Sequence, residues 1–486
     1  MAENTNDTLC VIHQSTDFEL VKSSTLFQVA SRIWILTSHK LFPFEISSLE
    51  AQLADAGKTL AGAACFGDFL DDKSLVACDD QASAALLPHV GSADYIAKYQ
   101  AKMTTLKNQA LLEAIGHHWQ FENIIVSEGL GISSSAWLAA EKNTSVIPAV
   151  TESNSFAKVR QFAQSLWRRI YKPFKRYDLL RIQGETPVFF WSSISRLNFQ
   201  PGINFRTIRG NIQELQSILT SSEGGVLATT IHEYDPAGLQ QQLRAPFEIY
   251  VDGLHPANMP RCYLDGYPDA CYVVRDMFDD QWFRQFGKTT RPGREFLTSS
   301  KMELPGSSRP VNRIYLMLNH AGDWMALINR SDTDLLLLAF VELAKLFPEV
   351  QFVVRPHPGT AHPDHEGTCA INRIKKLIKV TRLGNLEVSG GTLEQDLAAA
   401  DLIISEYSNV LVEGWRQGIP GLIVNLTRRR NFMQDYSALG FPTVTSEEQL
   451  HSWFARILAR PQDLIDIHTS AATGYNQRLA IFLESL

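Results

Sequence analysis

The sequence lacks a Cys-x-x-Cys pair, and its six cysteines are scattered between Cys10 and Cys369. Closely spaced cysteines mark structural zinc sites and disulfide frameworks, so we expect neither and predict reduced thiols. No apolar run approaches the roughly 20 residues that a membrane-spanning helix needs. The N-terminal stretch Met1-Ala-Glu-Asn-Thr-Asn-Asp has no signal-peptide pattern, and we expect a cytoplasmic protein.

Excess positive charge is also absent. The net charge is −7, which argues against bulk nucleic-acid binding, and no nucleic-acid partner is expected. No Asp-x-Asp follows an expected strand; the pairs Asp71-Asp72 and Asp279-Asp280 fall in loop and helix contexts. We therefore predict no obligatory metal and no cofactor.

The length of 486 residues is too great for one ordinary core, so about two or three domains are expected. Apolar residues make up 45% of the chain and charged residues 20%, as in ordinary globular proteins. The most informative stretch is 350–424. Its apolar runs, such as Phe352-Val-Val and Leu402-Ile-Ile, suit strands that are covered on both faces. After Ser405 the pattern becomes helical, which predicts a βαβ unit of a doubly wound sheet.

Polar residues follow the strands of this unit, where parallel sheets bind ligands. Arg355 and His357 follow one strand, and Ser405 and Ser408 follow another. Ser408 is a plausible N-cap, so the helix start would offer N–H groups to a phosphate. Asn409 and Glu413 share a helix face, and we place Glu413 against a ribose. The alternative is a rigid proline loop in which His357 only caps the strand.

Arg355-Pro-His357-Pro, followed by Ser405-Glu-Tyr-Ser-Asn409 and then Glu413-Gly, resembles the nucleotide-binding half of GT-B glycosyltransferases. The nearest resemblance is to bacterial surface-polysaccharide enzymes, namely capsule Kdo transferases, His-Pro-motif sialyltransferases and teichoic acid glycerophosphotransferases. It covers roughly the last third of the chain. It implies an α/β protein with two Rossmann-like domains facing a cleft, and a metal-independent enzyme.

The domain division expected from this resemblance has an acceptor-side domain at 1–288, with an insertion around 150–222. A linker at 289–310 leads to a donor-binding domain at 311–486, whose last helix would cross back. The donor would be a nucleotide-linked sugar or sugar acid, with a CMP-linked donor favoured. Its expected contacts are Asn319, His320, Arg355, His357, Ser405, Tyr407, Ser408, Asn409 and Glu413.

The acceptor side is expected at the strand ends of the first domain. A buried strand ends in Glu128-Gly129, and another is followed by His232-Glu233. In a GT-B enzyme the edge that carries Glu128 faces the acceptor, which would be a glycan or a lipid-linked glycan. The alternative for Glu128 is a helix-capping turn, and both interpretations stay open.

Three residues are candidates for catalysis. The first is His357, which would contact the donor phosphate. Asp252 resembles the base of the acidic sialyltransferase motif, although Val251 replaces that motif's first acid; the alternative is a plain Asx turn. Asp323 lies in a turn similar to the Asp-bearing turns of the Kdo transferases and could act as a nucleophile. The same Gly-Asp pair also occurs in plain turns.

Basic and aromatic residues alternate over 167–177 in an otherwise acidic protein. This stretch could contact the inner membrane surface, because anionic lipids attract Lys and Arg, or it could be a solvated helix end or an acceptor-side lid. Three function classes remain: a glycosyltransferase of surface-polysaccharide synthesis, which we favour, a sugar-nucleotide epimerase of the same fold, and a non-catalytic nucleotide-sugar-binding scaffold.

Overall fold

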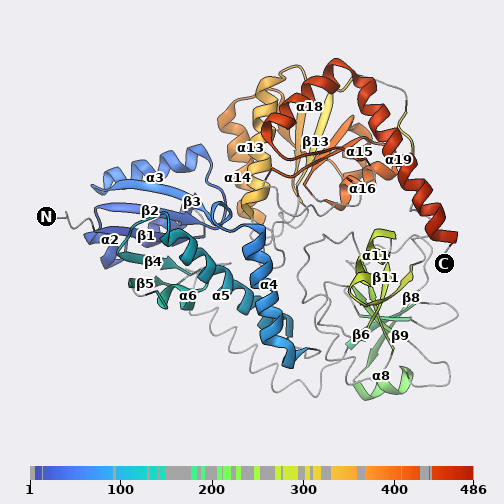
Figure 1. Ribbon diagram of the computed structural model, residues 1–486, viewed down its shortest axis with the longest axis horizontal. Helices are drawn as coiled ribbons and strands as arrows, with labels where there is room; N and C mark the ends of the chain where they lie inside the picture. The colour runs from blue at the N-terminus through green and yellow to red at the C-terminus, as the bar shows by residue number, and fades with distance from the viewer. Residues whose placement is uncertain are drawn as a thin grey trace.

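The computed structural model describes most of the chain. The described residues are 6–13, 15–90, 95–128, 132–140, 142–148, 177–182, 188–191, 205–210, 212–219, 226–230, 246–251, 269–274, 277–293, 301–306, 310–318, 330–357, 367–406, 408–426, 437 and 440–484. They contain three β-sheets of five, seven and six strands. Figure 1 shows the three sheets with their helices as three neighbouring units.

The first sheet is entirely parallel, with the order β3-β2-β1-β4-β5. Its central strand, Asp7–Ile12, is buried along its whole length, as expected for a strand covered on both faces. The strands are β1 (Asp7–Ile12), β2 (Arg32–Thr37), β3 (Thr59–Cys65), β4 (Asn123–Ser127) and β5 (Asn143–Ile147). The helices are η1 (Ser15–Asp17), α1 (Phe18–Val21), α2 (Thr25–Val29), α3 (Pro43–Asp55), η2 (Phe66–Asp68), α4 (Asp72–Leu86), η3 (Leu87–His89), α5 (Tyr95–Gly116) and α6 (Ser134–Leu138).

The second sheet has the order β12-β11-β10-β9-β7-β6-β8. Strand β6 runs antiparallel to both of its neighbours, and the other pairs are parallel. Its strands are β6 (Tyr177–Ile182), β7 (Val188–Trp191), β8 (Phe205–Gly210), β9 (Val226–Thr230), β10 (Phe247–Tyr250), β11 (Cys271–Val274) and β12 (Thr289–Pro292). Helices α8 (Ile212–Leu219) and α11 (Met277–Gln285) belong to the same unit.

The third sheet is parallel, with the order β15-β14-β13-β16-β17-β18. Its strands are β13 (Arg313–Met317), β14 (Gln351–Arg355), β15 (Leu386–Val388), β16 (Leu402–Ser405), β17 (Gly421–Val424) and β18 (Thr443–Val444). Its helices are α13 (Arg330–Leu346), α14 (Gly367–Thr381), α15 (Leu393–Ala399), α16 (Asn409–Arg416), α18 (Glu447–Ala459) and α19 (Pro461–Glu484). The expected βαβ unit is therefore present as β16–α16–β17.

The α/β class with parallel Rossmann-like sheets is confirmed. One such unit is expected from the sequence over 1–288, whereas the structure has two sheets there, because β6 to β11 pair with one another and not with β5. Strand β12, at the start of the expected linker, pairs with β11. Further on, the main chain of Met302 exchanges two hydrogen bonds, 2.9 and 2.8 Å long, with the Asn476 side chain of α19.

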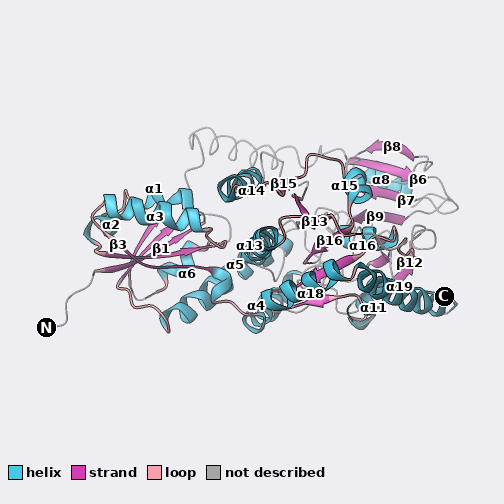
Figure 2. Cartoon of the chain, turned by 90° about the horizontal axis from the view of Figure 1, so that it is seen from above, coloured by secondary structure: helices cyan, strands magenta, loops and turns pink. Residues whose placement is uncertain are grey.

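Helix α19 extends from the third unit to the neighbourhood of α11 in the second unit, as both ribbon views show (Figures 1 and 2). In the part of the chain that the structure describes, no helix is both long enough and apolar enough to cross a membrane. The basic and aromatic stretch at 167–177 lies outside the described residues except for its last residue, Tyr177, which begins β6.

Candidate functional site

The carboxyl edge of the third sheet has the geometry of a ligand site. From β13 the chain goes to β14 and β15 on one side, and then returns to β16 on the other side. Such a reversal of strand order leaves a crevice outside the strand ends, where doubly wound proteins bind their ligands. Here the reversal lies between β13 and β16.

Ser405 holds this edge together. It is the last residue of β16 and is completely buried. Its hydroxyl donates to the carbonyl oxygen of Met317 at 2.7 Å and accepts the backbone N–H of Ser408 at 3.2 Å. One side chain thus fixes the end of β13 to the turn that begins α16. Ser405 is expected from the sequence to contact the donor; in the structure its hydroxyl positions the helix start.

Ser408 is the N-cap of α16. Its backbone is extended, at φ −74° and ψ 139°, and its side-chain oxygen accepts the N–H of Val410 at 3.3 Å. The first turn of any helix has N–H groups without partners in the helix, and its dipole favours a negative charge there. The start of α16 therefore offers anion-binding amides beside the switch point of the sheet.

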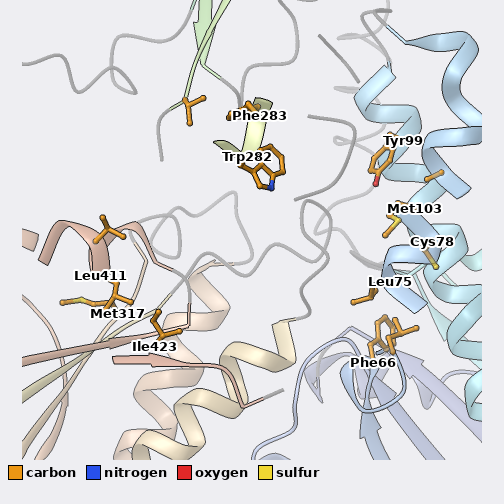
Figure 3. Packing of buried hydrophobic residues seen from close by; sticks show 14 of the residues in the cluster. Phe66, Leu75, Cys78, Tyr99, Met103, Trp282, Phe283, Met317, Leu411 and Ile423 are labelled. Carbon is orange, nitrogen blue, oxygen red and sulfur yellow. The ribbon is translucent and has the colours of Figure 1, made fainter. Parts of the chain in front are cut away.

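Helix α16 is held in place by close packing. Leu411, Val412 and Trp415 are buried, and Trp415 stacks on Phe441 with ring centroids 3.9 Å apart. Figure 3 shows Leu411 beside Met317 and Ile423 of the sheet. The position of the N-terminus of the helix thus follows from the core beneath it.

Arg355 has protein partners that the sequence did not reveal. Its guanidinium forms an ion pair with Asp396 of α15 and donates to the carbonyl of Gly391 at 3.0 Å. Asp396 also accepts the hydroxyl of Ser389 at 2.6 Å. These bonds hold the Arg355 side chain toward the end of β15, and its Nη1 nitrogen donates to both Asp396 and Gly391.

His357 and Glu413 are half-buried residues at the same edge, one just after β14 and the other on α16. Asn409 begins α16, and Glu406, in the turn before it, is only 5% exposed. The other predicted site residues lie outside the described part of the chain: Asn319, His320, Tyr407, Asp323, Asp252, Gly129, His232 and Glu233.

The first sheet has a corresponding edge, because its strand order also reverses, between β1 and β4. His13 lies two residues beyond Val11 of β1, and Glu128 lies two residues beyond Val126, the partner of Val11 in β4, so both follow the strands at the same edge. The Ser38 hydroxyl lies 2.8 Å from His13 Nδ1 and donates to the His13 carbonyl at 3.0 Å. The exposed Glu128 accepts the hydroxyl of Ser134 at 3.0 Å.

His13 and Ser38 were not predicted from the sequence as members of this edge. The signal was nevertheless present, since each residue directly follows or ends an apolar strand pattern, as Arg355 and Ser405 do. Among the described residues, no group of three or more His, Cys, Asp or Glu side chains could hold a metal ion.

No family model and no curated protein matches this sequence. Among solved structures, the chain is similar to a sucrose-phosphate synthase from Thermosynechococcus elongatus, at 14% identity over 56% of this chain and 75% of that one, with a TM-score of 0.39. An Anabaena protein, HepE, solved with UDP and glucose, is 13% identical over 75% of this chain and 92% of its own, with a TM-score of 0.35. A UDP-N-acetylglucosamine 2-epimerase from Rickettsia bellii is 12% identical over 56% of this chain and 77% of its own, with a TM-score of 0.34. Similarities this low assign no family and no substrate.

Proposed function

We propose that the protein is a GT-B glycosyltransferase that binds a nucleotide-linked sugar at the carboxyl edge of the third sheet and transfers the sugar to a glycan or lipid-linked acceptor. The observation that carries the proposal is the start of α16: Ser408 caps it, Ser405 braces it, and it lies at the switch point between β13 and β16. A phosphate group fits such a helix start.

The chemistry of transfer requires that the departing phosphate be stabilised and that the acceptor hydroxyl lose a proton. In the proposal the amides at the start of α16 and the imidazole of His357 receive the phosphate. Glu413, on the same helix, accepts hydrogen bonds from the ribose. Asp252 and Asp323 remain the two proposed catalytic carboxylates, as a base for inversion or as a nucleophile for retention.

The acceptor belongs, in this proposal, at the edge of the first sheet. Glu128 is exposed there, and His13 is held by Ser38 at the neighbouring strand end. A hydroxyl-rich ligand suits an exposed carboxylate and an imidazole, since both accept hydrogen bonds. The resemblance to surface-polysaccharide enzymes favours a CMP-linked donor and a cytoplasmic protein at the inner membrane surface.

A thermal-shift screen with CMP, CDP, UDP, GDP and ADP tests the nucleotide site, because a ligand that binds only the folded state raises the melting temperature. We expect CMP or CDP to give the largest shift. A clear preference for UDP would refute the cytidine assignment and would leave the helix-start site intact. No shift with any of the five nucleotides would count against the site itself.

The variant His357→Ala tests the phosphate contact. A lost hydrogen bond to a charged group costs about 1.5–3 kcal/mol, or roughly a 10- to 150-fold weaker affinity for the nucleotide. His357 lies in a half-buried strand-end segment, so we expect little change in stability. Donor turnover without any acceptor would instead indicate an epimerase, and tight binding without turnover would indicate a scaffold.

A further inference from the structure

Arg373 of α14 joins the third unit to the first. Its Nε and Nη2 atoms donate to the two carboxylate oxygens of Glu45, at 2.8 and 2.7 Å, and Nη2 also donates to the carbonyl of Lys40. Its Nη1 donates to Asp334 of α13 at 2.7 Å. Every nitrogen of the guanidinium thus has an acceptor, and two of those acceptors, Glu45 and Lys40, belong to the first unit.

The same contact buries an aromatic residue. Phe42, the residue before α3, has no exposed surface and belongs to the hydrophobic cluster of the third unit. The guanidinium carbon of Arg373 lies 3.7 Å from the centroid of the Phe42 ring. One turn further along, the Lys376 ammonium lies 4.8 Å from the Phe44 ring. A buried aromatic ring and a bidentate ion pair therefore stabilise the same contact between the first and third units.

Burial also separates the charges from water. The side chains of Arg373, Glu45 and Asp334 are 15%, 8% and 11% exposed. Burial alone would lower the pKa of Arg373, but the neighbouring charges of Asp334 and Glu45 outweigh it and raise that pKa above its ordinary value. Removing the cation would leave two carboxylates buried side by side, so this contact is costly to open.

The contact joins loops at the carboxyl edge of the first sheet to helices of the third unit. Lys40 is in the loop after β2, which begins with Ser38, the partner of His13. Lys40 also forms an ion pair of 2.9 Å with Asp68, after β3. Figure 1 shows α13 and α14 on the side of the third unit that faces the first sheet. The loops of one edge therefore rest on the helices that follow β13 and β14.

We propose that this contact is a fixed joint, which keeps the edges of the first and third sheets in one relative position. Arg373 is then a positioning residue for the transfer, a role that rests on the function proposed above. Its side chain reaches no reacting group; it sets where the acceptor edge lies relative to the donor edge. The joint also predicts that these two units move together when the nucleotide binds.

Distance measurements test the joint without any assay of activity. Spin labels attached through unnatural amino acids at positions 29 and 380, where the native valines are exposed, report the separation of the two units. In the wild type we expect one narrow distance distribution, unchanged by saturating CMP or CDP. In Arg373→Met we expect a broader distance distribution. Lys375→Met is the control, because it changes an exposed residue on the same helix, and we expect it to keep the wild-type distribution.

Kinetics then test the positioning role. We expect Arg373→Met to lower kcat tenfold or more with the KM for the donor unchanged, Lys375→Met to leave both unchanged, and Arg373→Lys to recover part of the rate. A wild-type distance that changes on nucleotide binding would overturn the joint even if Arg373→Met does not fold. A folded Arg373→Met with wild-type distances and kcat would overturn both claims. If no transfer is found, the distances still decide whether the joint exists.

Discussion

Substitution of Gly414 tests whether the packing of α16 against the sheet holds the proposed donor site in place. A Cβ atom added at this position would lie 2.2 Å from Cδ1 of Ile403 in β16, far inside van der Waals contact. The next neighbours, at 3.5 and 3.7 Å, are ordinary contacts, so a single methyl group blocks the substitution. Gly414→Ala must therefore push α16 away from the sheet or force Ile403 out of its rotamer.

The expected magnitude combines two opposite effects. Alanine in a helix interior is favoured over glycine by about 1 kcal/mol. Inserting a methyl group into a packed core costs about 1–3 kcal/mol. We expect Gly414→Ala to lower the free energy of unfolding by up to about 2 kcal/mol. The displaced helix start should also reduce the melting-temperature shift that the nucleotide produces.

A second substitution isolates the cause. Ile403→Val removes the blocking Cδ1 atom and alone costs about 0.5–1.5 kcal/mol. In the double variant the clash is gone, so we expect a favourable coupling of about 1–3 kcal/mol and a restored nucleotide shift. Gly116→Ala is the control, because a Cβ there meets nothing within 4 Å. Urea unfolding measures the wild type and all four variants, and additive effects of Gly414→Ala and Ile403→Val would refute the packing argument.

Three further predictions concern single side chains. Arg355→Met should destabilise the fold by about 3 kcal/mol, measured by urea unfolding, because Asp396 would lose its buried partner; Asp396→Leu in the same chain should recover much of the loss. Glu413→Ala should bind a 2′,3′-dideoxynucleotide as tightly as the wild type does, yet bind the ribonucleotide more weakly. Equal losses of affinity for the two nucleotides would contradict the proposed contact between Glu413 and the ribose. Burial lowers the pKa of His468 to about 4 from 6.5, so the unfolded chain takes up the proton first and stability should fall by about 3 kcal/mol as pH drops from 6.5 to 4. His468→Leu should flatten that part of the pH profile, and an unchanged slope would contradict the assignment.

The edge of the third sheet could be predicted because its signals are local. The apolar runs of β14 and β16 are followed at once by polar residues, and Ser408 precedes a helical pattern. Each of these features depends on neighbours a few residues away, so periodicity and capping preferences identify them. Their meeting at one edge follows from the parallel direction of the strands alone.

The missed features depend on partners that are distant in sequence. Arg355 and Asp396 are 41 residues apart, and Arg373 and Glu45 are 328 residues apart. A hydrophobic pattern indicates that a strand exists but not which strand it pairs with, which is why the separate second sheet was not predicted. An arginine beside a strand end looks the same in sequence whether a phosphate or an aspartate receives it.

The two sheet edges differ in what they offer a charged ligand. The helix at the first edge, α6, has five residues, and the Glu128 carboxylate already lies at its start through Ser134. The helix at the third edge, α16, has eight residues and a neutral serine cap. A short helix has a weak dipole, and a carboxylate repels an anion, so we infer that a phosphate binds at the third edge and a neutral hydroxyl at the first. Glu406 is also buried at the third edge, so in this proposal directed hydrogen bonds hold the phosphate there more than net charge does.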